Sequence, residues 1–214
     1  DRQMIERLVS LDALGIYSVG YSFGMVMSIV MGAFATAWSP FFMSYRNKPD
    51  EARIVFSRVL TYYSLGFGAL IVLFFSTAKP IVLLMTAPAF YEAHLVVGLV
   101  AVGIMLKGCY LILLPGIYFA EKLYKQSAVE WIAAIVNIGL NLWLIPLFGI
   151  VGAATATFVS CLTLPIFAWM VARRYLMVDY EWQRIFNISM LILIASALLY
   201  FLSAWIDVGL VSTI

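Results

Sequence analysis

Long apolar stretches separated by short polar segments dominate the pattern of the chain. No charged residue occurs between Ala13 and Tyr45, and this stretch is longer than the ~20 residues that a membrane-spanning helix needs. Comparable apolar stretches follow at about 59–78, 95–120, 127–145, 149–172 and 185–206. The pattern therefore predicts an all-α polytopic membrane protein with about six transmembrane helices.

Residues 1–12 show a different, amphipathic pattern. Ile5, Leu8 and Val9 fall on one helical face, and charged side chains occupy the rest. Such a helix lies in the membrane interface rather than across it. We therefore expect one transmembrane helical domain over 1–214, with an interfacial helix at 1–12 and a membrane bundle at 13–206.

The apolar residues 80–91 need a separate interpretation. They number only about a dozen, which is too few to cross a bilayer, so they predict a re-entrant or interfacial piece. Lys79 and Pro80 are expected to end the preceding span near Ala78. His94 beside this piece is interpreted as a boundary residue, because one histidine makes no metal site.

The stretch 137–160 predicts two membrane helices folded back on each other. Asn137 and Asn141 lie four residues apart, hence on one helical face, and each amide needs a partner in an apolar setting. Pro146 and Gly149 lie where the turn is expected, because proline donates no backbone hydrogen bond and glycine relaxes the backbone.

Two series of small residues predict close contacts between helices, because small side chains let helix backbones approach each other in a membrane. Plain helix packing is the simpler interpretation of the first series, and a groove for substrate is the alternative. The residues are Gly20, Gly24 and Gly32 in the first series, and Gly149, Gly152 and Ala156 in the second.

Composition and charge exclude several classes of protein. Of the 214 residues, 64% are hydrophobic and only 11% are charged, whereas soluble domains have about 25% charged residues. A net charge of +2 without a Lys/Arg-rich run argues against a nucleic-acid partner. Cys109 and Cys161 lie within apolar runs and are interpreted as core residues. No metal-ligand, phosphate-loop or nucleophile motif is present, so we expect no catalytic residue, metal or cofactor.

The basic residues between the spans predict an orientation. Alternate loops carry nine and three Lys or Arg residues, and the positive-inside rule places the richer side in the cytoplasm. If residues 80–91 did cross the membrane, the later loops would change sides. The segment is too short to cross, so six spans are favoured. The nine are Arg46, Lys48, Arg53, Arg58, Lys122, Lys125, Arg173, Arg174 and Arg184, and the three are Arg2, Arg7 and Lys79.

Lys107 is the exceptional ionisable residue of the apolar spans. It lies about twelve residues, or about 18 Å, from either end of its predicted helix, too far for its side chain to reach the interface. An ammonium at that depth faces a polar cavity or pairs with another group, and such residues mark transport pathways. Structural pairing with a carboxylate, or a neutral lysine, is the alternative.

The sequence motifs resemble one family of membrane proteins. Two asparagines on one helix followed by Leu-Ile-Pro, Phe-Gly-Ile and Gly-Ala-Ala within 137–160 resemble the C-terminal half of bacterial polysaccharide flippases. These belong to the multidrug/oligosaccharidyl-lipid/polysaccharide export superfamily. Asp1-Arg2, the segment 14–18 (Leu-Gly-Ile-Tyr-Ser) and the segment 37–40 (Ala-Trp-Ser-Pro) extend the resemblance over nearly the whole chain.

The resemblance implies a fold and a function. The chain would be most of the C-terminal lobe of a two-lobe, MATE-like transporter, truncated at both ends, with an N-terminal half of the same chain as its partner. The transporter would lie in the inner (cytoplasmic) membrane among its lipids. It would flip an undecaprenyl-diphosphate-linked oligosaccharide for surface polysaccharide assembly, by alternating access. Lys107, Asn137 and Asn141 are the candidate substrate-binding residues.

Two other functions compete with the flippase. Cation-coupled export of drugs, found in the related multidrug and toxin branch, requires an acidic residue to carry the proton or sodium ion, and none is expected at mid-span. A membrane scaffold without transport requires no buried cation, so Lys107 argues against it.

Overall fold

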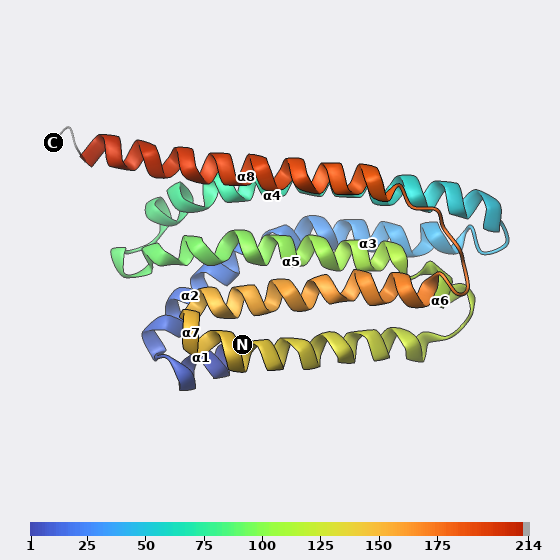
Figure 1. The fold of residues 1–214 in the computed structure, drawn as a ribbon, viewed down its shortest axis with the longest axis horizontal. Coiled ribbons are helices and arrows are strands. Elements are labelled where there is room, and N and C mark those ends of the chain that lie inside the picture. Colours follow the sequence, from blue (N-terminus) through green and yellow to red (C-terminus); the bar gives the residue numbers. More distant parts are fainter. Residues whose placement is uncertain (212–214) are drawn as a thin grey trace.

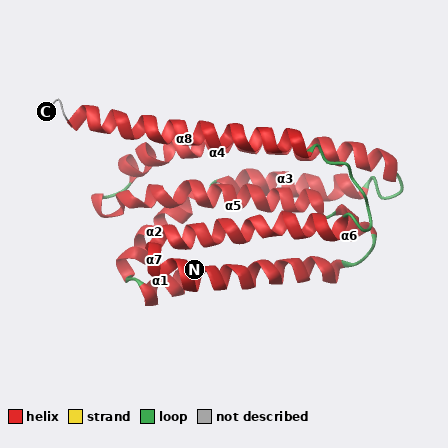
Figure 2. Cartoon of the chain, in the orientation of Figure 1, coloured by secondary structure: helices red, strands yellow, loops and turns green. Residues whose placement is uncertain are grey.

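Helices make up nearly the whole chain, as the sequence predicts for an all-α membrane protein (Figures 1 and 2). The computed structural model describes residues 1–211, with side chains over 1–199. The elements are α1 (Arg2–Leu8), α2 (Leu11–Gly24), α3 (Met27–Met43), α4 (Pro49–Met85), the 3₁₀ helix η1 (Pro88–Ala93), α5 (His94–Leu113), α6 (Pro115–Phe119), α7 (Leu123–Ala172) and α8 (Trp182–Val211).

Several of these helices are long and apolar enough to cross a membrane. Four segments meet that condition in the described part: α4, the segment from η1 to α6, α7 and α8. The bent pair of α2 and α3 makes a fifth. The chain is therefore a multi-pass membrane protein. Because α7 reverses its direction within the bundle, its two arms can each cross, which gives the six spans expected from the pattern.

The reversal of α7 confirms the hairpin predicted at 137–160. Gly149 has non-helical dihedral angles (φ +56°, ψ −130°), which a residue with a side chain rarely adopts. On either side of it, Asn137 donates a hydrogen bond to Ser160 over 3.2 Å, although 23 residues separate them. Figure 1 shows the two arms, yellow before Gly149 and orange after it, running back along each other.

Helix α4 corrects two of the predicted boundaries. It begins at Pro49, within the segment interpreted as a polar connection, where proline at the first turn precedes Asp50 and Glu51. It also continues through Pro80 to Met85, so the expected end near Ala78 is wrong. Proline removes one backbone hydrogen bond, and membrane helices tolerate that loss where neighbouring groups compensate. Residues 80–91 form the end of α4 and most of η1, and they do not cross the bundle.

The first apolar stretch is broken rather than continuous. Helices α2 and α3 meet at Met25 and Val26 and are bent by 44° relative to each other. The single span expected over 13–45 is therefore a kinked pair. The backbone N–H of Val26 bonds to the carbonyl of Phe23, three residues back, instead of to the fourth residue back.

The first series of small residues lies at a helix contact over only part of its length. A Cβ added at Gly20 would lie 2.3 Å from the carbonyl oxygen of Ala93, and one at Gly24 would lie 2.7 Å from Val100. A Cβ added at Gly32 would meet nothing within 4 Å, so the packing expected there is absent within the described residues. Helix α3 does pack against α5 further along, where the indole N–H of Trp38 donates to the carbonyl of Leu111 over 3.0 Å.

The second series separates into a turn and a contact. Gly149 supplies the positive φ angle of the turn, and a Cβ there would meet no described atom within 4 Å, so the packing expected of Gly149 is also absent within the described chain. A Cβ at Gly152 would lie 2.2 Å from the carbonyl oxygen of Leu144 on the first arm. Ala156 is fully buried one turn later.

The amphipathic N-terminus is shorter than the expected helix over 1–12. Helix α1 ends at Leu8, and Ser10 caps α2 by accepting a hydrogen bond from the backbone N–H of Ala13. Ile5 is fully buried, whereas Leu8 and Val9 are exposed. Helix α1 packs against α2 and α7, and this anchors Asp1 at the hairpin.

The loops with most of the basic residues lie at one end of the bundle, at the right in Figure 1. Arg46 after α3 pairs with Glu121 before α7. The ammonium of Lys125 lies 5.0 Å from the ring centre of Tyr175 in the loop between α7 and α8. These contacts connect the loops that precede α4, α7 and α8. The positive-inside rule assigns these same loops to one side of the membrane. Helix α8 continues past 206, where the bundle was expected to end, and residues 212–214 lie outside the described residues.

Candidate functional site

A polar hollow lies between α5 and the two arms of α7. Its volume is about 310 Å³, and it contains charged groups of both signs. The lining residues are Asp1, Tyr21, Lys107, Glu130, Ala133, Ala134, Asn137, Thr157, Ser160, Cys161 and Leu164. Two predicted site residues, Lys107 and Asn137, thus belong to one hollow.

Asn141 is buried beside this hollow and connects the polar side chains around it by hydrogen bonds. The side chain is fully buried, and its amide nitrogen donates to the Asp1 carboxylate and, over 3.0 Å, to the amide oxygen of Asn137. Asn137 in turn donates to Ser160 on the second arm. The predicted pair of asparagines therefore forms one chain of hydrogen bonds that joins both arms of α7. The amide oxygen of Asn141 has no hydrogen-bond partner among the described residues.

The Asp1 carboxylate is the group that sequence reasoning missed. Its second oxygen accepts hydrogen bonds from Thr157 over 2.8 Å and from Tyr17 over 3.3 Å. The two asparagines indicated that a polar partner exists, but nothing local pointed to a residue 140 positions away. The expectation from the sequence concerned acidic residues within the spans, and Asp1 lies outside them; α1 brings its carboxylate against α7.

Helix α5 ends six residues beyond Lys107, at Leu113, and α6 continues to Phe119. Lys107 therefore lies midway along the stretch formed by α5 and α6, on the side facing the hollow. The side chain is exposed, and no carboxylate lies within ion-pair distance of its ammonium in the described part of the chain. The placement agrees with the prediction that its ammonium faces a polar cavity. An unpaired ammonium at membrane depth attracts an anion, since no carboxylate of the described chain neutralises it.

Glu130 marks the end of the hollow that lies nearer the basic loops. Its carboxylate accepts hydrogen bonds from Tyr110 over 2.8 Å and from Gln126 over 3.1 Å. Glu130 and Asn141 lie eleven residues apart on the first arm of α7, or about 16 Å at 1.5 Å per residue. Polar side chains therefore occur along about 16 Å of this arm, which is about half the thickness of a ~30 Å hydrocarbon core.

The hollow contains groups that can bind a polar ligand. The described residues contain no group of three or more histidine, cysteine, aspartate or glutamate side chains that could hold a metal ion. Cys109 and Cys161 are both buried and unpaired, as predicted for core residues. The hollow instead offers a cation, two carboxylates, hydroxyls and amides, which together match a ligand with both anionic and hydroxyl groups.

Comparison with protein-family models, with curated proteins and with solved structures gives no match for this chain. The assignment to the flippase family therefore stays a prediction from the sequence motifs.

Proposed function

We propose that this chain is part of a transporter that moves a lipid-linked oligosaccharide with a diphosphate head group across the cytoplasmic membrane. The observation that carries the proposal is the exposed ammonium of Lys107, midway along the apolar stretch of α5 and α6 and facing a polar hollow. The flippase resemblance of the sequence motifs supports the same assignment. The movement would follow alternating access, with this bundle rocking against a second lobe.

The chemistry of the hollow fits the two parts of such a substrate. Lys107 supplies the positive charge for a diphosphate, and a charge-assisted hydrogen bond is strong where water is scarce. Asn137, Thr157 and Ser160 supply amide and hydroxyl groups that pair with sugar hydroxyls. The lipid tail stays in the hydrocarbon, so only the polar head needs this path.

Cation-coupled export of drugs is the second candidate, and the Asp1 carboxylate favours it. This group lies among Tyr17, Asn141 and Thr157, away from the ends of the spanning helices. A carboxylate in that setting can exchange a proton or hold a cation. The same group is also compatible with a flippase that uses an ion gradient, so the substrate distinguishes the two candidates.

Variants at Lys107 test the proposal in the full-length protein. We expect Lys107→Ala and Lys107→Glu to abolish delivery of surface glycan in a flippase-deleted host, at unchanged membrane levels. The loss of a charge-assisted contact corresponds to about ten- to a hundredfold in rate. Lys107→Arg is expected to retain part of the activity, since the charge stays but the guanidinium fork is wider. Lys122→Ala, in the exposed loop before α7, is the control and should behave as wild type.

Two outcomes would contradict the proposal. Wild-type glycan from Lys107→Ala would show that this lysine does not handle substrate. Reduced folded protein in Lys107→Ala, restored by neutralising a carboxylate elsewhere, would assign it to a structural ion pair. Drug efflux that depends on Asp1 and Lys107 in a cell without the glycan pathway would instead favour the exporter.

A further inference from the structure

A second, apolar groove lies on the other side of α5, beneath α8. Two hollows of about 480 and 510 Å³ lie among α4, α5, the second arm of α7 and α8. Both are lined by Met105, Leu106 and Ser189, so they form one continuous groove. The proposed transport function uses neither hollow.

The groove exists because α8 packs on α4 and not on α5. A Cβ added at Gly68 of α4 would lie 2.0 Å from the side chain of Ile192, so the glycine permits a close approach there. Along the same helix, Ile185 lines the first hollow, and Ile192 and Leu193 line the second. Because these segments are apolar enough to span a membrane and the lining is apolar, the space is suited to hydrocarbon rather than to water.

The length of the groove matches a chain that starts at the membrane interface. Along α8 the lining residues extend from Trp182 to Ala197, fifteen residues apart, or about 22 Å at 1.5 Å per residue. Half of the hydrocarbon core is about 15 Å thick. One hydrocarbon chain inserted from the Trp182 end therefore occupies the groove lengthwise, across its own leaflet and past the midplane.

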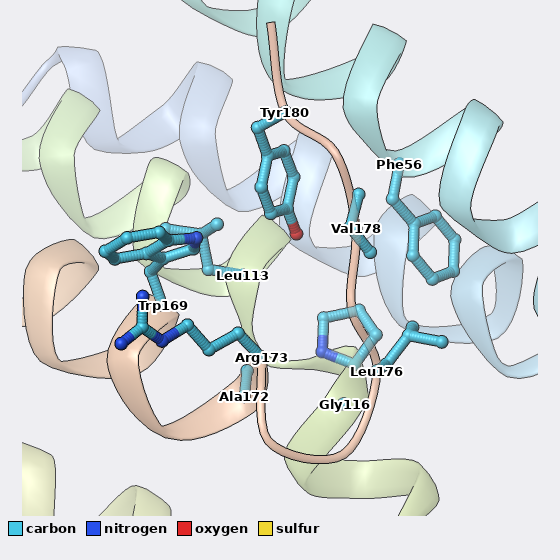
Figure 3. A pocket seen from close by; sticks show the side chains of 10 residues that line it. Phe56, Leu113, Gly116, Trp169, Ala172, Arg173, Leu176, Val178 and Tyr180 are labelled. Carbon is cyan, nitrogen blue, oxygen red and sulfur yellow. The ribbon is translucent and has the colours of Figure 1, made fainter. Parts of the chain in front are cut away.

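The Trp182 end has the features of a head-group site. The rings of Trp169 and Trp182 meet edge to face, with centres 5.3 Å apart, as is typical of interfacial aromatic residues. The guanidinium of Arg173 lies 4.6 Å from the ring centre of Trp169, and Figure 3 shows the two side chains side by side. Arg184 nearby is paired with Glu181, whereas Arg173 has no carboxylate within ion-pair distance among the described residues.

We propose that this groove binds one anionic phospholipid, with an acyl chain beneath α8 and the phosphate at Arg173. An unpaired guanidinium beside two tryptophans complements an anionic head, and basic pockets between membrane helices bind such lipids. The lipid fills the space that separates α8 from α5 and so attaches α8 to the bundle. This proposal does not depend on which substrate the protein transports.

The first test fills the groove. Full-length protein is reconstituted in vesicles of equal phosphatidylglycerol and phosphatidylcholine, extracted in mild detergent and examined by native mass spectrometry. We expect one retained phosphatidylglycerol per wild-type protein. Ser189→Phe should lose it, because the new ring would enter the groove where the two hollows join. Leu191→Phe, on an exposed face of α8 that lines neither hollow, is the control and should keep it. Equal retention in Ser189→Phe and wild type would overturn the proposal.

The second test removes the charge. Arg173→Gln should lower the preference for phosphatidylglycerol over phosphatidylcholine about fivefold, the usual effect of one basic residue near a membrane surface. Arg174→Gln, the exposed neighbour in the same loop, should leave the preference unchanged. Added polyprenyl diphosphate is the competitor. If it displaces the phospholipid from wild type, the groove holds the tail of a transported lipid and the proposal is wrong.

Discussion

At the scale of single residues, the site depends on polar side chains that are removed from water. The amide nitrogen of Asn141 donates to Asp1 and to Asn137, and the residue has no exposed area. The Asp1 carboxylate is partly buried, and a hydrogen bond to a charged group contributes more to stability than one between neutral groups. Asn141 therefore stabilises the position of α1 as well as the shape of the hollow.

Replacing Asn141 tests this coupling. Asn141→Leu should destabilise the protein by about 1–3 kcal/mol, because the partly buried Asp1 carboxylate loses a hydrogen-bond donor. The measurement is the melting temperature of the full-length protein in detergent, and Asn187→Leu on an exposed part of α8 is the control. In a double-mutant cycle, Asp1→Asn should reduce the cost of Asn141→Leu. Fully additive effects would mean that the two side chains do not interact in the protein.

The sequence predicted this site in part, and the limit is physical. Asn137 and Asn141 were predictable as a pair because a four-residue spacing fixes their relation on one helix. The exposure of Lys107 to a cavity followed from its depth in an apolar helix. The contact of Asn141 with Asp1 joins residues 140 positions apart, and only the packing of α1 against α7 brings them together.

At the scale of elements, local signals predicted some boundaries and not others. The turn at Gly149 was predictable because a proline and a glycine occur together between two apolar runs. Pro80 alone did not end α4, because a membrane helix accepts a proline where its neighbours replace the lost hydrogen bond. The kink between Gly24 and Met27 has no proline, and the pattern gave no sign of it.

The hairpin contact is testable with one substitution at two glycines of α7. Gly152→Leu should lower the yield of folded protein, because its Cβ would lie 2.2 Å from the carbonyl oxygen of Leu144 and overpacking costs about 1–3 kcal/mol. Gly139→Leu is the matched control, since a Cβ there meets no described atom within 4 Å. The readout is monodisperse protein recovered by gel filtration. A yield for Gly152→Leu equal to that of Gly139→Leu would show that the arms do not meet at this position.

At the scale of the whole molecule, charge gives the bundle its orientation. The loops that precede α4, α7 and α8 are joined at one end by the pair of Arg46 with Glu121 and by Lys125 against Tyr175. Most of the Lys and Arg residues lie in or beside these loops. The positive-inside rule predicts that this end faces the cytoplasm. The opposite end holds η1 and the turn of α7.

Cysteine labelling tests that orientation. In full-length protein with Cys109 and Cys161 replaced by alanine, single cysteines are introduced by Asn47→Cys, Arg174→Cys and Ala89→Cys, all at exposed positions. A membrane-impermeant maleimide should label the Ala89→Cys protein in intact cells. It should label the other two only after the membrane is opened, because their loops lie at the basic end. Labelling of Asn47→Cys and Arg174→Cys from opposite sides would contradict the six-span bundle, since those loops share one end. Labelling of both from outside would keep the fold and reverse its orientation.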